Sequence, residues 1–404
     1  MAAPKFDIRK LPTAYKGSVK NLRVAKPPTA TKPGRYVFEF TDDYSVFDYG
    51  KMPDTLPGKG AAMAIGTAFL FERLEDPRTW KDLARSSVWD HVRDQAWRDR
   101  LLSSSTLRAA QRAGVATHYR GLVTREGKTV RTGGLKEPTN LLAVESVGIV
   151  RPESVAFGGG RLWNYNAIHP GLAHFLVPLE CVFRFGVPKG SSLLERLAST
   201  PGYHVELGLP RRPRSGTWLP FPIVEFFSKL EPGDRFLRPE SALNFSGLTG
   251  GEFQEVFDLT CLIAIFLLDF YGRHGVRVWD GKFEFLKAGR LMLGDAITPD
   301  ELRLTYSSVQ ISKEPLRQYY KKYDPAFVEG MREAKRTSAA TGGPLRTILH
   351  ETLGVRPKRL DPEFLAAAAR MYTDLTTQAT GLSIFGRAAD LHGVLETFRK
   401  FDVA

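Results

Sequence analysis

The sequence predicts a mixed fold of helices and strands, large enough for two lobes and an additional segment. A chain of 404 residues exceeds the roughly 100–200 residues of a single domain. Strand patterns occur at residues 36–48 and 176–185, whereas residues 251–274 form a long apolar helix candidate. A hydrophobic share of 43% provides for a sizeable core.

The first half of the chain alternates strand and helix signals. Residues 1–36 are rich in lysine and proline around the segment YKGSVKNL. Residues 36–48 (YVFEFTDDYSVFD) begin as an alternating aromatic strand and end in an acidic turn. Residues 76–110 are predicted to be helical, because apolar and charged residues mix at helical spacing. Residues 121–166 combine short strand-like runs with glycine-rich turns, including 158–160.

The second half contains the clearest elements. LVPLECVFRF at 176–185 predicts a buried strand, and SSLLERL at 191–197 predicts a helix that starts at a serine cap. VRVWDGKFEF and RLMLGDAIT predict two strands of a hairpin, joined by a turn at 287–289. A small-residue linker is expected at 336–346, followed by a mostly helical tail at 361–400.

Charge, cysteine content and apolar runs limit the class of protein. The formal net charge is +13, but the basic residues are scattered and show no zinc-finger, RNP-type or basic-zipper pattern, so we expect no nucleic-acid partner. Two cysteines are too few for a disulfide framework or a cysteine-based zinc site. The apolar run 261–270 contains Asp269 and is shorter than the about 20 residues of a membrane span. The opening MAAPKFDIRK lacks the apolar stretch of a secretory signal, so we expect a cytoplasmic protein.

The predicted hairpin carries the most informative charged residues. Asp280, Lys282 and Glu284 stand two residues apart, so their side chains leave one face of a strand. Asp295 on the partner strand would add a third carboxylate. Clustered carboxylates raise one another's pKa unless a cation neutralises them, and Mg²⁺ bridging nucleotide phosphates is the usual cation for such ligands. The pattern fits either a metal site or a solvated face with an internal Lys–Glu pair.

Two glycine-containing segments have the composition of anion sites. In KGSVK at 16–20, glycine lets the backbone approach phosphate and lysine supplies charge, although a plain surface turn has the same pattern. Arg184 precedes GSS at 190–192, where a helix start can hold an anion; an ordinary serine cap with a surface arginine is the alternative. Glu225 and Lys229 in PIVEFFSKL are four residues apart, which also fits a simple helical salt bridge.

Six segments occur in a fixed order along residues 12–335. The first three are YKGSVKN, DDYSVFD and LPGKGAAMA; the more specific ones are LVPLECVFRF…KGSSLLERL, PIVEFFSKLEPGD and DGKFEF…GDAITPDELR. In this order they resemble the SAICAR synthetase (phosphoribosylaminoimidazole-succinocarboxamide synthetase) family. The resemblance implies an α+β fold of two lobes with a kinase-like ATP cleft, an N-terminal antiparallel β lobe and a mixed α/β second lobe. The expected domains are 1–175, 176–336 and a helical C-terminal extension at 337–404.

The resemblance further implies an ATP- and Mg²⁺-dependent ligase of purine biosynthesis. ATP would phosphorylate the carboxylate of carboxyaminoimidazole ribonucleotide, and the amine of L-aspartate would displace phosphate from the acyl phosphate to give SAICAR. Because a carboxylate is a poor acyl donor until it is phosphorylated, such a protein mainly positions its substrates and neutralises charge. The partners would be small molecules, and a homo-oligomer is left open.

The resemblance also implies roles for individual residues. The nucleotide would be contacted by Lys16, Ser18, Lys20, Leu176, Glu180 and Lys229, with the adenine at the hinge just before Pro178. The catalytic residues would be Lys229, Asp280 and Lys282. The azole ribonucleotide would be held by Arg184, Ser191, Asp234 and Arg303, and Mg²⁺ by Glu284 and Asp295.

Several positions depart from the family pattern. Ser18 replaces the first lysine of G-K-x-K, so one phosphate contact is lost or is taken over by Lys16. The acidic pair of the family becomes Asp295-Ala296, and Glu301 and Leu302 replace small residues beside the phosphate arginine. Nucleotide-binding groups are thus kept better than substrate contacts.

These departures leave other functions open. One alternative is a related ligase acting on another azole nucleotide carboxylate in natural-product biosynthesis. A second is a small-molecule kinase on the same scaffold, which would use the ATP and Mg²⁺ groups but would need no bound amine. A non-catalytic binding protein is disfavoured, because the lysines and carboxylates of the expected site are all retained.

Overall fold

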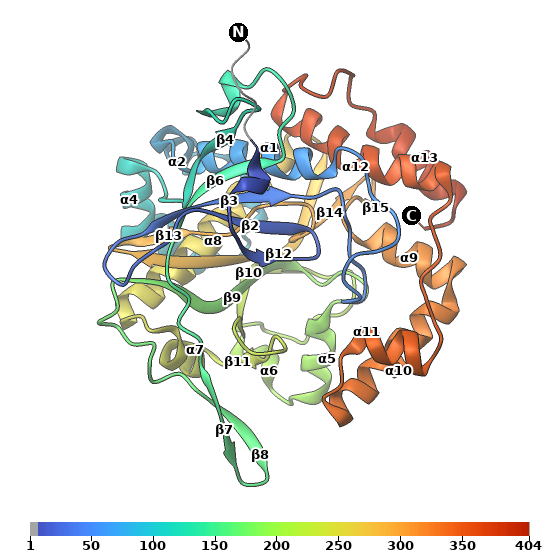
Figure 1. Ribbon diagram of the computed structural model, residues 1–404. Helices are drawn as coiled ribbons and strands as arrows, with labels where there is room; N and C mark the ends of the chain where they lie inside the picture. Colours follow the sequence, from blue (N-terminus) through green and yellow to red (C-terminus); the bar gives the residue numbers. More distant parts are fainter. Residues whose placement is uncertain (1–6, 404) are drawn as a thin grey trace.

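The computed structural model describes residues 7–403 and contains an α+β protein built on two antiparallel sheets (Figure 1). The predicted α+β class is therefore confirmed. Residues 1–6 of the expected first domain and Ala404 of the expected extension lie outside the described residues. Within residues 7–403, no helix is both long enough and apolar enough to cross a membrane.

The first sheet has six strands and lies in the N-terminal half of the chain. Their order across the sheet is β1-β2-β3-β6-β4-β5. The strands are β1 (Thr13–Lys16), β2 (Lys20–Lys26), β3 (Gly34–Phe40), β4 (Tyr119–Val123), β5 (Thr129–Val130) and β6 (Leu141–Ser146), with the short helical turns η1 (Ile8–Lys10) and η3 (Thr132–Gly134) beside them. The alternating strand predicted from residue 36 is confirmed as β3.

Helix α1 (Lys59–Leu74) covers this sheet with a buried apolar face that includes Ile65, Ala68 and Phe71. The acidic turn after β3 fixes the start of the helix, because the carboxylate of Asp42 accepts hydrogen bonds from the backbone N–H groups of Gly58 and Gly60. A carboxylate at this end also complements the positive pole of the helix dipole.

The helical region predicted at residues 76–110 is confirmed, but it is divided into four short segments. These are α2 (Pro77–Leu83), η2 (Ser87–His91), α3 (Gln95–Leu102) and α4 (Ser105–Ala113). Each segment begins after a residue whose side chain accepts a hydrogen bond from the first turn: Asp76, Ser86, Asp94 and Ser104. Successive caps restart the helix each time, and helical spacing of apolar residues alone does not reveal these breaks.

The second sheet has seven strands, and half of the predicted site residues lie on them. Its order is β11-β10-β9-β12-β14-β15, with β13 paired to β12. The strands are β9 (His174–Gly186), β10 (Trp218–Ser228), β11 (Phe236–Leu237), β12 (Val276–Ala288), β13 (Leu291–Leu293), β14 (Leu302–Tyr306) and β15 (Val309–Gln310). The strand predicted at 176–185 and the hairpin are confirmed, although the second arm of the hairpin is shorter than expected.

Helix α8 (Gly250–Gly272) is the predicted long apolar helix, and it packs against β9, β10 and β12. Thr249 and Glu252 form a reciprocal capping box that defines its first turn. Three shorter helices, α5 (Ser192–Ser199), α6 (Tyr203–Glu206) and α7 (Pro239–Ser246), complete this half of the protein.

A two-stranded ribbon of β7 (Glu153–Phe157) and β8 (Gly160–Asn164) projects from the body of the molecule at the bottom of Figure 1. Gly158 and Gly159 form its tip with φ values of +56° and +78°, a conformation that glycine adopts readily. The glycine run is therefore the turn of this ribbon.

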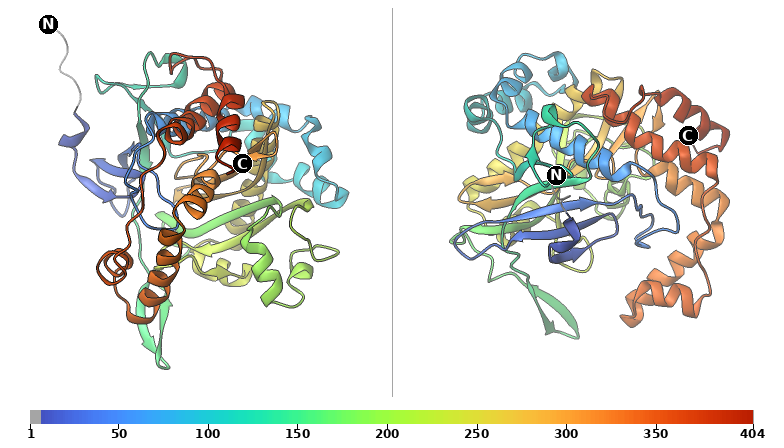
Figure 2. Two further views of the ribbon diagram at one scale, coloured as in Figure 1. Left: turned by 90° about the vertical axis from the view of Figure 1, so that its right-hand side faces the viewer. Right: turned by 45° about the horizontal axis from the view of Figure 1, so that its top comes forward.

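The C-terminal part consists of helices that return to the N-terminal half. They are α9 (Glu314–Tyr323), α10 (Pro325–Thr341), α11 (Leu345–Thr347), η4 (Ile348–Thr352), α12 (Pro362–Thr380) and α13 (Leu391–Lys400). The helical tail predicted at 361–400 is confirmed as α12 and α13; α12 lies beside α1, and α13 packs against α12 (Figure 2). The linker predicted at 336–346 is wrong in its first half, because α10 continues to Thr341 and ends at Gly342, whose φ is +73°.

The two sheets are connected by a short backbone contact near the end of β13. The N–H of His118 donates to the oxygen of Leu293 at 3.0 Å, and the N–H of Leu293 donates to the oxygen of Ala116 at 2.9 Å. Nε2 of His118 lies 2.8 Å from the backbone oxygen of Asp295. Burial lowers the pKa of His118 to about 4, so this ring is neutral at pH 7 and serves as a structural hydrogen-bonding group.

Candidate functional site

Three neighbouring strands of the second sheet bring predicted site residues together. In the antiparallel register, Glu180 on β9 lies opposite Glu284 on β12. Strand β10 flanks β9 on its other side and ends just before Lys229. Because side chains alternate along a strand, Asp280, Lys282 and Glu284 leave one face of β12.

These strands hold a group of charged residues that we call the lysine–carboxylate cluster. Its members are Lys20, Glu180, Lys229, Lys282, Glu284, Asp295 and Glu301. Nζ of Lys229 lies 3.0 Å from Oε1 of Glu180 and 2.7 Å from Oε1 of Glu284. Nζ of Lys282 lies 2.8 Å from the same oxygen of Glu180 and 3.3 Å from Oε2 of Glu301.

The cluster spans both sheets and is open to solvent on its lysine side. Lys20, on β2 of the first sheet, forms an ion pair with Asp295. The side chains of Lys229 and Lys282 are 28% and 31% exposed, whereas that of Glu180 is 5% exposed. The side chains of Lys229 and Lys282 are therefore partly accessible to an anion from solvent.

Burial and neighbouring charges move the pKa values of two carboxyl groups in opposite directions. Burial and the charge of Asp295 raise the pKa of Glu284 to about 7. Burial alone would also raise the pKa of Asp295, but the ammonium of Lys20 outweighs it and lowers the value to about 2.

The two central lysines stay cationic at neutral pH. Burial would lower the pKa of Lys229, but the carboxylates of Glu284 and Glu180 outweigh it and raise the pKa. The pKa of Lys282 is raised in the same way by Glu301 and Glu180. Both ammonium groups are therefore held as permanent charges in a fixed position.

The carboxylates fit a Mg²⁺ site of the kind that a nucleotide completes. Mg²⁺ takes oxygen ligands and is commonly bound by one or two carboxylates together with water and substrate phosphates. Glu284 and Asp295 supply two such carboxylates, and a cation beside them would neutralise the charge that raises the pKa of Glu284. Within residues 7–403, no group of three or more His, Cys, Asp and Glu side chains is arranged to hold a metal ion by itself.

A second polar group, the arginine cluster, lies along the same strands. Its members are Arg184, Ser191, Ser192, Arg196, Tyr203, Glu225, Asp280 and Arg303. Arg184 donates from Nε to Glu225 at 2.7 Å and from Nη1 to Asp280 at 3.0 Å. Glu225 also accepts hydrogen bonds from Arg196 at 2.6 Å and from the hydroxyl of Tyr203 at 2.8 Å.

Within this cluster Arg303 has the most capacity to bind a further anion. Arg184 is only 5% exposed and is occupied by its two carboxylates. The side chain of Arg303 is 23% exposed, and its Nη1 lies 3.2 Å from Asp280 without forming a well-directed hydrogen bond. Ser191 precedes α5 as predicted, but its hydroxyl makes no capping bond and lies 3.5 Å from Nη1 of Arg184.

The remaining predicted residues lie around these clusters. Lys16 is exposed at the end of β1, and Ser18 lies in the turn that leads to β2. Leu176 is on β9, opposite Leu286 of β12. Asp234 is in the loop between β10 and β11, where partial desolvation and the charge of Glu180 raise its pKa, although its surface is exposed.

Several contacts were not predicted from the sequence. The helical salt bridge of Glu225 with Lys229 does not form, because these residues lie on and after a strand and Glu225 is engaged by arginines. A buried ion pair joins Nζ of Lys59 to Oδ2 of Asp300 at 2.9 Å. Both residues occur in segments singled out above, LPGKGAAMA and TPDELR, but neither position was assigned a role.

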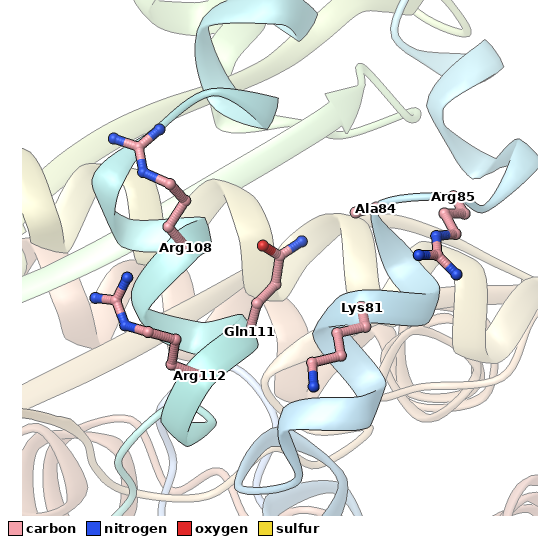
Figure 3. A pocket seen from close by; sticks show the side chains of 6 residues that line it. All are labelled: Lys81, Ala84, Arg85, Arg108, Gln111 and Arg112. Carbon is pink, nitrogen blue, oxygen red and sulfur yellow. The ribbon is translucent and has the colours of Figure 1, made fainter.

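A separate surface cavity of about 650 Å³ lies between α2 and α4 (Figure 3). Its lining residues are Lys81, Ala84, Arg85, Arg108, Gln111 and Arg112. The lining contains no carboxylate that could bind a metal and no predicted site residue. We therefore place the candidate site at the lysine–carboxylate and arginine clusters.

Comparison with known proteins supports a single family. Residues 172–334 match the family model described as SAICAR synthetase. A protein of Archaeoglobus fulgidus, named provisionally as a phosphoribosylaminoimidazole-succinocarboxamide synthase, is 32% identical over 372 residues, which cover 91% of this chain and 95% of the relative. A phosphoribosylaminoimidazole-succinocarboxamide synthase of Thermoplasma acidophilum is 33% identical over 164 residues, 38% of this chain and 55% of the relative.

Solved structures agree at the level of the fold. A SAICAR synthase from Saccharomyces cerevisiae in complex with SAICAR superposes with a TM-score of 0.53 at 18% identity, covering 94% of this chain and 99% of that chain. At this identity the likeness supports the fold alone.

Proposed function

Because this chain belongs to the SAICAR synthetase family, we propose that it joins the carboxylate of carboxyaminoimidazole ribonucleotide to the amine of L-aspartate, with consumption of ATP. The family is one of ATP-dependent ligases of purine biosynthesis. The observation that carries the proposal in this chain is the lysine–carboxylate cluster, which spans both sheets and lies on the same strands as the arginine cluster. One cluster suits a nucleotide and its metal, and the other suits a sugar phosphate.

The reaction proceeds in two displacements. In the first, an oxygen of the azole carboxylate attacks the γ-phosphorus of ATP, the bond to the bridging oxygen breaks, and ADP leaves. In the second, the amine of aspartate attacks the acyl carbon, inorganic phosphate leaves with the bonding electron pair, and the amine releases its proton. Because positioning and charge neutralisation dominate phosphoryl transfer, fixed ammonium groups are the protein's main contribution.

The nucleotide belongs on the lysine side of the cluster. Lys229 and Lys20 contact the phosphates, because Lys229 pairs with Glu180 and Glu284 of the second sheet while Lys20 reaches Asp295 from the first sheet. Lys16 and Ser18 border the phosphates from the neighbouring turn, and Leu176 and Glu180 border the adenine along β9. Lys282 lies between nucleotide and acceptor. Its positive charge there stabilises the negative charge of the phosphoryl group during transfer.

Glu284 and Asp295 would hold Mg²⁺, which supplies charge neutralisation of the phosphate oxygens when bound. The two carboxylates keep this position between the lysines because Lys229 and Lys20 each pair with one of them. Asp280, on the same face of β12 as Lys282 and Glu284, lies toward the acceptor and contacts Arg184 and Arg303.

The ribose 5′-phosphate belongs at the arginine cluster. Arg303 supplies an incompletely used guanidinium, and Arg184 with Ser191 forms the wall behind it. A planar guanidinium binds phosphate in two-pronged fashion, so Arg303 fixes orientation as well as charge. Asp234 lies near the open edge and helps to orient the substrate.

In this account residues 1–175 and 176–336 are the two lobes of a cytoplasmic enzyme, and residues 337–404 are an extension that packs on the first lobe. The nucleotide lies where Lys20 of the first lobe meets Asp295 of the second. The separate sheets support this division, although β9 already begins at His174 and residue 336 lies inside α10.

One observation favours a second candidate, a ligase for another azole nucleotide carboxylate. Glu301 stands where the family has a small residue, and its carboxylate lies 3.3 Å from Nζ of Lys282. A negative charge at this position lies beside Lys282 and changes the charge that the acceptor substrate meets. A substrate with a different ring substituent would meet that carboxylate.

Trapping of the acyl phosphate tests the proposed chemistry. The enzyme is mixed with Mg·ATP and carboxyaminoimidazole ribonucleotide in the absence of aspartate, with hydroxylamine as the nucleophile. We expect the hydroxamate of the azole together with one ADP per hydroxamate. ADP formation without any hydroxamate would contradict an acyl phosphate, and a stable phosphorylated product would indicate a kinase.

A further inference from the structure

We propose that Tyr372, in helix α12 of the C-terminal extension, is a positioning residue for the acceptor side of the site and acts through Asp300. The hydroxyl of Tyr372 donates to Oδ1 of Asp300 at 2.7 Å. Tyr372 is 1% exposed, and the side chain of Asp300 is completely buried. This role rests on the proposed function, since it concerns the substrate that Arg303 and Lys282 contact.

Asp300 is held from three directions. Its Oδ2 lies 2.9 Å from Nζ of Lys59 at the start of α1 and 3.7 Å from Nζ of Lys313 before α9. Nζ of Lys59 also lies 5.1 Å from the centre of the Tyr372 ring. A buried carboxylate persists only when it is paired and hydrogen-bonded, so this arrangement fixes the position of Asp300.

The residues that follow Asp300 point their side chains into the site. Glu301 lies 3.3 Å from Nζ of Lys282, and Arg303 lies 3.2 Å from Asp280. The backbone is equally constrained, because the N–H of Lys282 donates to the oxygen of Glu301 at 3.2 Å. The N–H groups of Glu301 and Leu302 both donate to the oxygen of Thr298, at 3.0 and 3.2 Å. Because Asp300 lies within the turn that these bonds close, we expect a displacement of Asp300 to shift its chain neighbour Glu301 and, two residues further on, Arg303.

Helix α12 is placed to exert this control because it packs closely on α1. The hydroxyl of Thr376 donates to the backbone oxygen of Ala62 at 3.2 Å. A Cβ at Gly58 would lie 3.1 Å from Cγ2 of Thr373, so glycine permits the close approach of the two helices. Asp300 lies within residues 172–334, which match the family model, whereas Tyr372 lies outside them. The C-terminal extension thus contacts the loop that contains Asp300.

The test compares two variants that each lose one buried hydroxyl. Tyr372→Phe removes only the donor to Asp300. Tyr320→Phe is the control, because Tyr320 is fully buried and its hydroxyl donates to the backbone oxygen of Lys358 at 3.0 Å and lies 2.8 Å from the hydroxyl of Tyr44, away from the loop that contains Asp300. We expect Tyr372→Phe to raise the KM for the azole ribonucleotide on the order of tenfold, with the KM for ATP nearly unchanged. The control should change neither KM, although both variants lower Tm.

Equal effects of the two variants on both KM values, or an unchanged azole KM in Tyr372→Phe, would overturn the proposal. Hydrogen exchange of residues 296–303 provides a readout that needs no turnover: exchange should accelerate in Tyr372→Phe and not in Tyr320→Phe. If the wild-type enzyme makes no product from these substrates, the proposed function fails, and hydrogen exchange still decides the role of Tyr372. Equal exchange in both variants would then reject it.

Discussion

At the scale of single residues, Lys229 is the centre of the nucleotide side. Its ammonium lies within 3.0 Å of the carboxylates of Glu180 and Glu284, so it both neutralises them and presents charge to a phosphate. We expect Lys229→Ala to lower kcat by about a hundredfold or more, as for other fixed electrostatic groups. Steady-state phosphate release measures this loss.

Lys287→Ala is the matched control for that variant. Lys287 lies on β12 of the same sheet and pairs with Glu252 at 2.7 Å, outside the lysine–carboxylate cluster. It should keep wild-type turnover. Near wild-type turnover in a folded Lys229→Ala protein would remove this lysine from the mechanism.

Arg303 is the residue on which recognition of the sugar phosphate depends. Arg303→Lys keeps the positive charge but loses the planar two-pronged group, so the KM for the azole ribonucleotide should rise by about tenfold or more while the KM for ATP stays the same. Arg277→Lys, on the neighbouring strand β12, is the control and should change neither value. Parallel changes in both KM values would contradict the phosphate role of Arg303.

The sequence predicts those parts of the site that depend on local spacing. Asp280, Lys282 and Glu284 share a face because strand alternation requires it. By contrast, the partners of Arg184 and Lys59 come from residues 225 and 300, and such contacts depend on tertiary packing. The spacing of residues within one segment does not indicate which distant residue will contact it, so these ion pairs were not predicted.

At the scale of elements, α1, α12 and the loop before β14 meet at Asp300, which makes their packing sensitive to acid. Burial would raise the pKa of Asp300, but Lys313 and Lys59 outweigh it and lower the value to about 2. Burial lowers the pKa of Lys59 as well, so the pair is less favourable than the shift of Asp300 alone indicates.

Because the folded pKa of Asp300 lies below the ordinary value of about 3.9, its ionised form stabilises the protein above pH 4, and this contribution is lost as the pH falls toward 2. The Tm of wild type should therefore exceed that of Asp300→Asn most above pH 4. Thermal unfolding from pH 6 to pH 2 should show this difference shrinking. A difference that stays constant over the range would contradict an ionised Asp300.

Element types were predictable where one pattern dominated. The apolar helix α8 and the strands β9 and β12 follow directly from their sequences. The breaks between α2, η2, α3 and α4 were not predicted, because each depends on a single capping side chain. The continuation of α10 through small residues also escaped prediction, since alanine, serine and threonine occur in helices and linkers alike.

At the scale of the whole molecule, a nucleotide held between the sheets should stabilise the fold. Lys20 and Asp295 bring opposite sheets to one place, so a ligand there contacts both lobes. A ligand present at a hundred times its Kd adds about 2.7 kcal/mol to the free energy of unfolding. Mg·ATP should raise Tm by several degrees in wild type and much less in Lys229→Ala, as measured by thermal unfolding. An equal rise in both would place the nucleotide elsewhere.

The overall arrangement was predictable only in outline. Two lobes and a helical tail follow from length, element types and family resemblance. The return of α12 to α1 was not predicted, because the tail's apolar spacing shows that a helix buries one face without showing what that face covers. That packing is the feature that connects the extension to the site.

The most direct test of the central claim is formation of the ligated product. Wild-type protein is incubated with Mg·ATP, carboxyaminoimidazole ribonucleotide and L-aspartate, and the products are identified by mass spectrometry. We expect the succinocarboxamide ribonucleotide, formed together with ADP and phosphate only when all three substrates are present. Nucleotide binding without any ligated product would contradict the claim and would indicate a different carboxylate or amine substrate.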